Sequence, residues 1–327
     1  MSEFFLELFS EEIPADLQKN LREKIFEDFK NLFEEKSIRS KKNFSFSTPN
    51  RLVLVFEGLD KQIKIKSKEI RGPKTSAPEQ ALEGFLRSNK INKMDLFKKK
   101  TEKDEFYFYK TVATSLKTHD LLTEFIPKIL SNYQWKKSMK WGEFDLNWGR
   151  PLKSILSIFD KKIVSFKFHH LASSNLTFLD KDFEEKKRSF ENFKKYEKFF
   201  EHNGVIVNQN KRLKIINKSF LKILGKKGLK INENPKLMDE VVNLVDSPNV
   251  LLCKFDKKFL SVPKEILTLT MESHQKYFPT FNDKNEITNE FLIVTNKKDH
   301  KGFIKIGNER VIAVSYTHLT LPTMAIV

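Results

Sequence analysis

Short apolar runs with strand character alternate with helical stretches along this 327-residue chain, and this alternation restricts it to a mixed α and β fold. Residues 4–9 form an apolar strand-like run, and Pro14 stands where a helix can begin. Residues 15–33 then predict an amphipathic helix. Its apolar face follows helical spacing through Leu17, Leu21, Ile25, Phe29 and Leu32.

The alternation of expected strands and helices continues to about residue 170. We expect strands at 51–57, 69–73 and 106–112, and helices at 79–88 and 121–133. Segments 154–159 and 162–168 bracket Asp160 and Lys161, which predicts a hairpin. The expected fold class is therefore α+β, with mixed or antiparallel sheets and flanking helices.

A change in composition begins near residue 180. Segment 180–230 is rich in Lys, Glu, Asn and Phe, which predicts two or three amphipathic helices with a short strand at 204–208. Phe183, Phe190, Phe193 and Phe200 form a candidate apolar stripe. We interpret the segment as a lysine-rich helical insertion whose Phe face packs on the body, with an RNA-contacting arm as the alternative. The expected divisions are 1–179 (α+β region), 180–235 (insertion), 236–312 (return to the α+β body) and 313–327 (tail).

The chain is strongly basic, with a formal net charge of +17, which favours a polyanionic partner. Lysine supplies 51 of the 60 basic residues, and much of it can equally form a solvated coat. The nine arginines are therefore more informative than the lysines. Cys253, the single cysteine, stands in an apolar run and is expected to be a core residue.

The location of the protein is predicted from its ends and hydropathy. The N-terminus is acidic and lacks signal-peptide character, and no run of about 18 apolar residues is present. We expect a cytoplasmic protein that makes no membrane contact.

Segment 271–278, MESHQKYF, mixes polar and aromatic residues between two apolar runs, as a recognition surface does. Further short motifs follow in order: FFLELFSEEIP (4–14), TPNRLVL (48–54), RGPK (71–74), MKWG (139–142), WGRPLKSIL (148–156), EVVNLVDSPNVL (240–251) and GNERVI (307–312). Together they resemble the beta subunit of the heterotetrameric bacterial glycyl-tRNA synthetase over about residues 1–312.

The resemblance implies a division of labour. Glycine activation, with ATP and Mg²⁺, would belong to the alpha subunit of an α2β2 tetramer, and the beta subunit would contribute tRNA(Gly) binding and assembly. It also implies that the N-terminal region is like the B3/B4 module of the phenylalanyl-tRNA synthetase beta subunit. No cofactor, metal or catalytic residue is expected in this chain.

The candidate tRNA-binding residues pair a cation with an aromatic ring or a rigid turn, since arginine suits phosphates and aromatic planes suit RNA bases. For each of them packing is the alternative, and for Trp141 and Trp148 packing is preferred. The candidates are Arg51, Arg71, Lys74, Lys140, Arg150, His274, Lys276, Tyr277 and Arg310.

Two other functions stay open. One is a basic RNA-binding or assembly module without preference for tRNA(Gly), and the other is a hydrolytic editing module. His274 with Glu272 is the best acid–base pair, whereas Glu11 and Glu12 are expected to favour a helix N-terminus.

Two segments depart from the family pattern. TFLDKDF (177–183) stands where the family has a Gly-His-(Arg/Lys)-Phe motif, so no function is carried onto Asp180. Residues 313–327 have a composition foreign to the rest of the chain, and we expect them to be non-native sequence at a truncated end.

Overall fold

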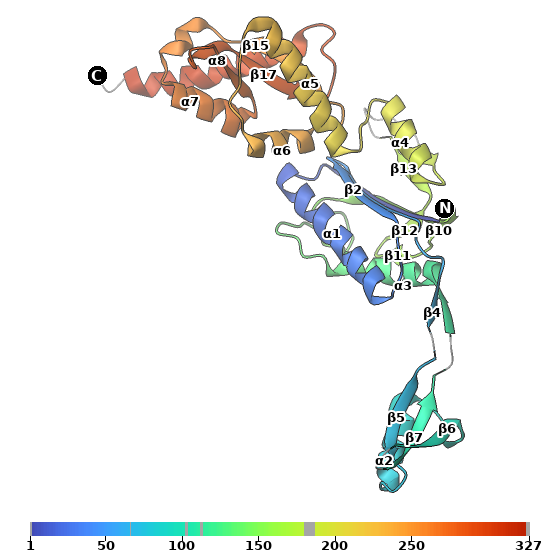
Figure 1. Ribbon diagram of the computed structural model, residues 1–327. Helices are drawn as coiled ribbons and strands as arrows, with labels where there is room; N and C mark the ends of the chain where they lie inside the picture. The colour runs from blue at the N-terminus through green and yellow to red at the C-terminus, as the bar shows by residue number, and fades with distance from the viewer. Residues whose placement is uncertain (1, 66, 102–103, 112–113, 180–186, 325–327) are drawn as a thin grey trace.

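A computed structural model describes residues 2–65, 67–101, 104–111, 114–179 and 187–324. Its helices and its largely antiparallel sheets confirm the α+β class (Figure 1). Three parts are visible in Figure 1: a central body, a C-terminal unit beside it, and a small outlying unit on a thin ribbon.

The central body is built on a mixed sheet in the order β11-β12-β9-β1-β3-β2, with β10 added on β9. Pairing is antiparallel except between β12 and β9, which run parallel. The strands are β1 (Glu3–Ser10), β2 (Lys42–Thr48), β3 (Arg51–Glu57), β9 (Leu152–Phe159), β10 (Lys162–Ile163), β11 (Lys167–Phe168) and β12 (Leu171–Ser174). A separate pair, β13 (Leu176–Phe178) and β14 (Lys187–Ser189), completes the body.

Both faces of this sheet are buried, which explains why five of the eight residues of β1 are Phe or Leu. Successive side chains of a strand point to opposite faces, so Phe4 and Phe5 enter different cores. The core around Phe4 is covered by α1 (Ala15–Glu35) and α3 (Thr118–Asn132). The core around Phe5 is covered by α4 (Phe193–His202), through Phe193, Tyr196 and Phe200.

The C-terminal unit has a three-stranded antiparallel sheet between two helical layers. Its strands are β15 (Asn249–Lys254), β17 (Ile287–Thr295) and β16 (Phe278–Phe281), in that order. One layer holds α5 (Gln209–Lys227) and α6 (Pro235–Leu244). The other holds α7 (Lys264–Leu269), α8 (Phe303–Met324) and short turns at Lys257–Ser261 and Thr270–Gln275.

Arg212 of α5 joins the C-terminal unit to the body. Its buried guanidinium donates to the carbonyls of Ile206 at 2.7 Å, Val207 at 2.9 Å and Val242 at 3.0 Å. A fourth bond, of 2.8 Å, reaches the Ser47 carbonyl on β2. These four bonds satisfy backbone acceptors of three segments, so Arg212 is a structural residue.

The outlying unit is reached through the antiparallel ribbon of β4 (Gln62–Ile65) and β8 (Thr114–Lys117). Its sheet has the order β5-β7-β6, from β5 (Glu69–Lys74), β7 (Glu105–Lys110) and β6 (Leu96–Lys100). Helix α2 (Glu79–Asn89) and a 3₁₀ turn (Lys93–Asp95) complete it. Figure 1 shows the unit standing away from the body at the end of the ribbon.

Most predicted elements are confirmed, including the turn at Asp160 and Lys161, both of which have positive φ. The strand predicted at 204–208 is wrong: Gly204 has positive φ, and the segment pairs with no strand of the described chain. Its backbone groups form other hydrogen bonds: Ile206 N–H donates to the Asp246 carbonyl, and Arg212 donates to the Ile206 and Val207 carbonyls.

Segment 180–230 also differs in detail from the expected helices. It contains the short strand β14, and its two helices enter different cores: α4 packs on the body and α5 on the C-terminal sheet. Phe190, Phe193 and Phe200 share one core, although Phe190 precedes the helix, and Phe183 lies outside the described residues. In the expected foreign tail, α8 continues as far as Met324, and Tyr316 is buried.

Candidate nucleic-acid interface

Arg51, the first predicted RNA contact, is buried in the body. Its side chain is 1% exposed, and its guanidinium carbon lies 4.5 Å from the Phe9 ring centre and 4.6 Å from the Phe200 ring centre. Nε lies 3.4 Å from Oε2 of Glu7, and the guanidinium also donates to the Phe178 carbonyl. In this position Arg51 cannot reach a phosphate.

Glu7 is the buried partner that the sequence did not reveal. It stands in an apolar strand, and its carboxylate accepts hydrogen bonds from the hydroxyls of Thr177 and Tyr196. Burial raises the pKa of Glu7, and Arg51 and the two hydroxyl donors oppose that rise. The pKa of the Tyr196 hydroxyl is also raised by burial, next to the Glu7 carboxylate. This cluster fixes α4 and β13 on the sheet.

Arg71 and Lys74 lie together on the outlying unit and are both exposed. The Arg71 guanidinium carbon lies 3.6 Å from the centre of the Phe106 ring, and Lys74 Nζ lies 5.9 Å from the same centre. Lys74 also pairs with Asp104 at 2.6 Å. Of the predicted residues, these two form the closest association of cations with an aromatic ring on a surface.

Lys140 and Arg150 belong to the loop between α3 and β9. Lys140 is exposed and lies 3.8 Å from Asp145, while Arg150 is half-buried and donates to the Gly149 carbonyl at 2.9 Å. The loop is tightly packed, since a Cβ at Gly149 would lie 2.2 Å from the Trp135 ring. Trp148 is 2% exposed, which confirms the preferred interpretation of this residue as core.

Segment 271–278 folds as a π-helical turn (Thr270–Gln275) that ends at Lys276 with φ of 60°. Tyr277 is buried, with its ring 5.1 Å from that of Phe291 and its hydroxyl 2.5 Å from Asn308 Oδ1. Lys276 pairs with Glu240 at 2.9 Å. Tyr277 is therefore placed for packing rather than for base stacking.

His274 is exposed on the same turn, and Arg310 is exposed on α8. Within the described residues, His274 makes no ion pair with Glu272, whose carboxylate instead accepts a 2.7 Å hydrogen bond from Asn234. The proposed acid–base pair is thus not assembled. The surface candidates remain Arg71, Lys74, Lys140, His274, Lys276 and Arg310, and the three lysines each lie in an ion pair.

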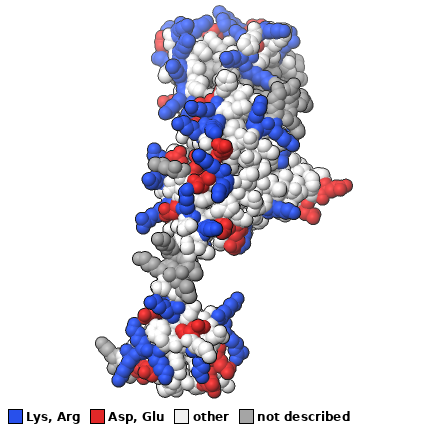
Figure 2. Space-filling view, turned by 90° about the vertical axis from the view of Figure 1, so that its right-hand side faces the viewer, with Lys and Arg blue, Asp and Glu red and all other residues white. Residues whose placement is uncertain are grey.

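Figure 2 shows lysine and arginine side chains spread over all three parts, with acidic residues among them. No continuous basic patch stands out on this face of the molecule. On this face charge alone does not locate an RNA site, and the arrangement of cations with aromatic rings is the more specific signal.

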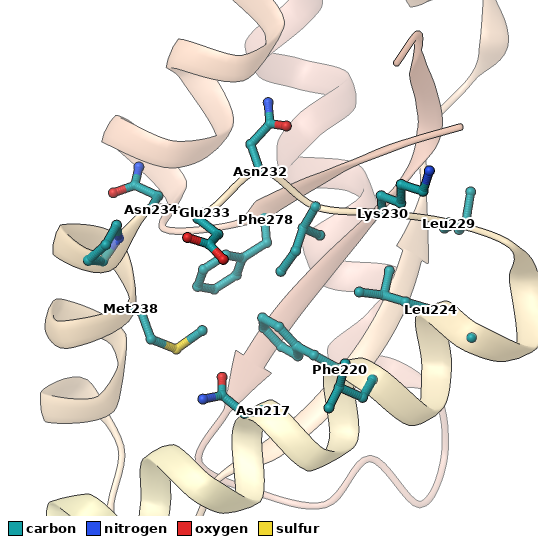
Figure 3. Close-up of a pocket in the computed structure, with 14 residues that line it drawn as sticks. Asn217, Phe220, Leu224, Leu229, Lys230, Asn232, Glu233, Asn234, Met238 and Phe278 are labelled. Carbon is teal, nitrogen blue, oxygen red and sulfur yellow. The ribbon is translucent and has the colours of Figure 1, made fainter. Parts of the chain in front are cut away.

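The C-terminal unit also contains a cavity of about 700 Å³ between α5 and α6 (Figure 3). Its walls are mainly apolar, including Phe220, Leu224, Met238 and Phe278, while Asn217, Lys230 and Asn234 are polar residues of the lining. None of the predicted RNA contacts lines it. No pattern in the sequence predicts this cavity.

Two searches of the described residues bear on other classes of site. They contain no group of three or more His, Cys, Asp or Glu side chains arranged to hold a metal ion. Nor does any helix in that part of the chain have the length and apolar character needed to cross a membrane.

Comparison with known proteins identifies the family. The family model described as glycyl-tRNA synthetase beta subunit matches residues 4–317. The chain is 38% identical over 314 residues to the glycine–tRNA ligase beta subunit of Rickettsia bellii (strain OSU 85-389), covering 96% of this chain and 48% of that protein. The corresponding protein of Rickettsia felis (strain ATCC VR-1525 / URRWXCal2) is 36% identical over 316 residues, covering 96% of this chain and 47% of that protein.

A third relative, from Rickettsia conorii (strain ATCC VR-613 / Malish 7), is 38% identical over 314 residues, covering 96% of this chain and 47% of the relative. This chain spans about half the length of the curated relatives it matches. The family match runs through all three parts of the fold, from β1 into α8. The chain belongs to the glycyl-tRNA synthetase beta subunit family.

Proposed function

We propose that this chain serves glycine–tRNA ligase by binding tRNA(Gly) and by assembling with a catalytic alpha subunit in an α2β2 enzyme. The observation that carries the proposal is the family match over residues 4–317. Both tRNA binding and assembly would take place in the cytoplasm. ATP and Mg²⁺ would bind at the alpha subunit, and we assign no catalytic residue to this chain.

The outlying unit is the best-supported RNA contact. It stands clear of the body, so a large polyanion can approach it without opening a core (Figure 1). Arg71 has no ion-pair partner among the described residues, and its planar guanidinium is exposed. Arginine binds phosphates through paired hydrogen bonds, which makes this position suitable for an RNA backbone.

The proposal is tested by measuring the affinity of the chain for tRNA(Gly) over a salt series, with and without purified alpha subunit. We expect binding that weakens with salt, because phosphate contacts release counterions. Arg71→Ala with Lys74→Ala should weaken binding and reduce the salt slope by about 1.5. Arg87→Ala is the matched control, because Arg87 is an exposed arginine of the same unit paired with Glu83 on α2.

Assembly needs a separate measurement. Mixing the chain with the alpha subunit should give a complex that elutes ahead of either component in size-exclusion chromatography. If the wild-type chain binds neither tRNA(Gly) nor the alpha subunit, the proposal is wrong.

A further inference from the structure

One face of the β5-β7-β6 sheet combines aromatic rings and cations. Arg71 pairs with Phe108 and Lys74 with Phe106 on one side of β7. On the other side, Phe97 pairs with Phe108 and Lys99 with Phe106. Directly opposed residues of antiparallel strands point to the same face. These six residues therefore share one face, which we call the aromatic–basic face.

The opposite face of the sheet is occupied by α2. A Cβ at Gly72 would lie 3.0 Å from the Phe85 ring of α2 and 3.1 Å from the Tyr107 carbonyl, so helix and sheet pack closely there. Leu82 of α2 is buried. The helix therefore covers this face of the sheet, although Phe106 on the aromatic–basic face is buried as well.

Phe106 is buried, but the other residues of the aromatic–basic face are open to solvent. Phe97 is 37% exposed, Phe108 is half-buried, and Arg71, Lys74 and Lys99 are exposed. Apolar groups that cluster on a surface with polar residues around them are typical of interaction sites. The adjacent Phe97 and Phe108 rings, with cations around them, form such a cluster.

The side chains of this face present flat surfaces in a row. The Phe97 and Phe108 rings stack with centroids 6.0 Å apart at 26°, and the Arg71 guanidinium lies over Phe106 at 3.6 Å. Lys99 Nζ lies 5.6 Å from the Phe108 ring centre and 2.8 Å from Glu69. Planar groups that can stack on bases thus lie beside cations that can bind phosphates.

We propose that the aromatic–basic face binds unpaired nucleotides of RNA, with bases stacked on Phe97, Phe108 and the Arg71 guanidinium. Lys74 and Lys99 would contact the phosphates. This inference rests on the proposed function, which it deepens by naming the part of the RNA that is bound. Bases in a duplex are already stacked on one another, so only loops or ends can use such a face.

The test uses the whole chain with a fluorescein-labelled eight-nucleotide single-stranded RNA and with a hairpin duplex of similar length. Phe97→Ala and Phe108→Ala should each weaken single-strand binding by about tenfold. Phe97→Trp should preserve it, whereas Phe97→Leu, which keeps an apolar side chain, should not. Phe108→Leu replaces Phe108→Ala if the latter melts at a lower temperature than wild type.

Neighbouring lysines provide a charge-matched control. Lys99 belongs to the aromatic–basic face, and Lys98 points to the α2 side, with Nζ 5.9 Å from the Tyr107 ring centre. Lys99→Ala should therefore weaken binding more than Lys98→Ala, although both remove one charge from β6.

Equal affinity for the duplex, or unchanged single-strand affinity in Phe97→Ala and Phe108→Ala, would overturn the inference. If wild type still binds tRNA(Gly) in that case, the proposed function stands and only the stacking face fails. If wild type binds neither tRNA(Gly) nor the single strand, both fail.

Discussion

Arg51 and Glu7 form an ion pair in the interior of the body, with Nε 3.4 Å from Oε2 and neither side chain more than 1% exposed. Removing Arg51 would leave the Glu7 carboxylate without its cation in a site from which water is excluded. Breaking a buried pair in this way costs about 3–5 kcal/mol. We therefore expect Arg51→Ala to lower the free energy of unfolding by that amount in urea titrations.

The control for Arg51→Ala is Arg39→Ala, at an exposed position, which should change the unfolding free energy by less than about 0.5 kcal/mol. An Arg51→Ala chain that is as stable as wild type but loses RNA affinity would contradict the structural assignment. It would return Arg51 to the surface candidates.

Arg212 should also contribute strongly to the free energy of unfolding, but through hydrogen bonds to backbone carbonyls. Arg212→Met removes donors from four backbone carbonyls, and leaving buried acceptors unsatisfied should cost about 3 kcal/mol or more. Because two of these bonds hold the Ile206 and Val207 carbonyls, we also expect faster proteolysis of the segment 203–208 between α4 and α5. Lys214→Met, at an exposed position of α5, is the control and should leave both measurements unchanged.

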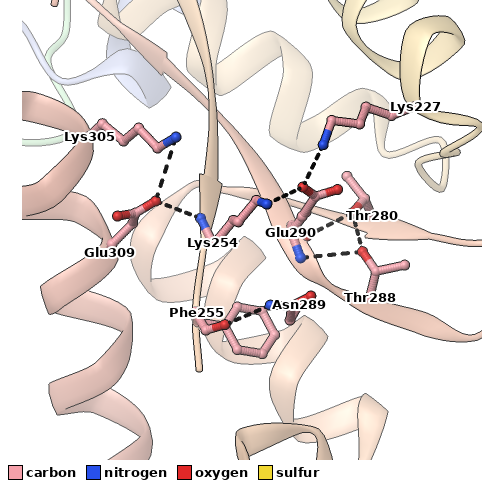
Figure 4. A network of polar contacts seen from close by, with 9 residues as sticks. All are labelled: Lys227, Lys254, Phe255, Thr280, Thr288, Asn289, Glu290, Lys305 and Glu309. Atoms are coloured by element: carbon pink, nitrogen blue, oxygen red, sulfur yellow. Dashed lines mark hydrogen bonds and ion pairs between the residues drawn. The ribbon is translucent and has the colours of Figure 1, made fainter. Parts of the chain in front are cut away.

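The ion pairs of Glu290 predict that the stability of the C-terminal unit depends on pH (Figure 4). Its carboxylate lies 3.2 Å from Lys227 Nζ and from Lys254 Nζ. Burial alone would raise the pKa of Glu290, but the hydrogen bonds from the two lysines outweigh it and lower the pKa below the usual 4.5. The ionised carboxylate therefore stabilises the fold above pH 4.5, and this contribution is lost as the pH falls through the lowered pKa.

The measurement compares the unfolding free energy of wild type with that of Glu290→Gln from pH 7 down to pH 3. We expect a difference of up to about 1 kcal/mol near neutral pH, because both lysines are partly exposed, and a smaller difference in acid. Glu79→Gln, at an exposed position of α2, should show no such trend. If the difference in unfolding free energy between wild type and Glu290→Gln grew in acid, the predicted direction of the pH dependence would be wrong.

Cys253 provides a probe of opening in the C-terminal unit. The thiol is buried, and burial raises its pKa to about 12, so the reactive thiolate is scarce at pH 8. We expect labelling by a disulfide reagent to be slow in the native chain and to accelerate in parallel with urea unfolding. A cysteine placed at the exposed neighbour, as Lys254→Cys in a Cys253→Ser background, should react at once. Rapid native labelling of Cys253 would contradict its position in the core.

Much of the fold could be predicted from local patterns. The apolar strand β1, the helical spacing of α1 and the turn at Asp160 and Lys161 each depend on neighbouring residues, and each is confirmed. The order of motifs along the chain also indicated the family, which the comparison confirms. Local patterns specify elements, and the family resemblance specifies their combination.

The candidate site was harder to predict because exposure depends on distant residues. Arg51 in β3 contacts Phe178 and Phe200, which lie more than 120 residues later in the chain. No pattern near Arg51 predicts these contacts. Tyr277 is buried by Phe291 of β17 in the same way. The failed strand at 204–208 has a related cause, since its carbonyls are satisfied by a side chain instead of a neighbouring strand.

The central claim is that the outlying unit carries an RNA contact that the rest of the fold does not need for stability. Among the described residues, the four apolar cores contain none between 66 and 113. Ile65 and Thr114 are paired across the ribbon, so residues 66–113 can be replaced by Asn-Gly to close a two-residue hairpin. The decisive measurement is tRNA(Gly) affinity of this shortened chain at fixed salt. We predict a wild-type melting temperature with affinity reduced at least tenfold; a shortened chain that folds and binds tRNA(Gly) as tightly as wild type would contradict the account.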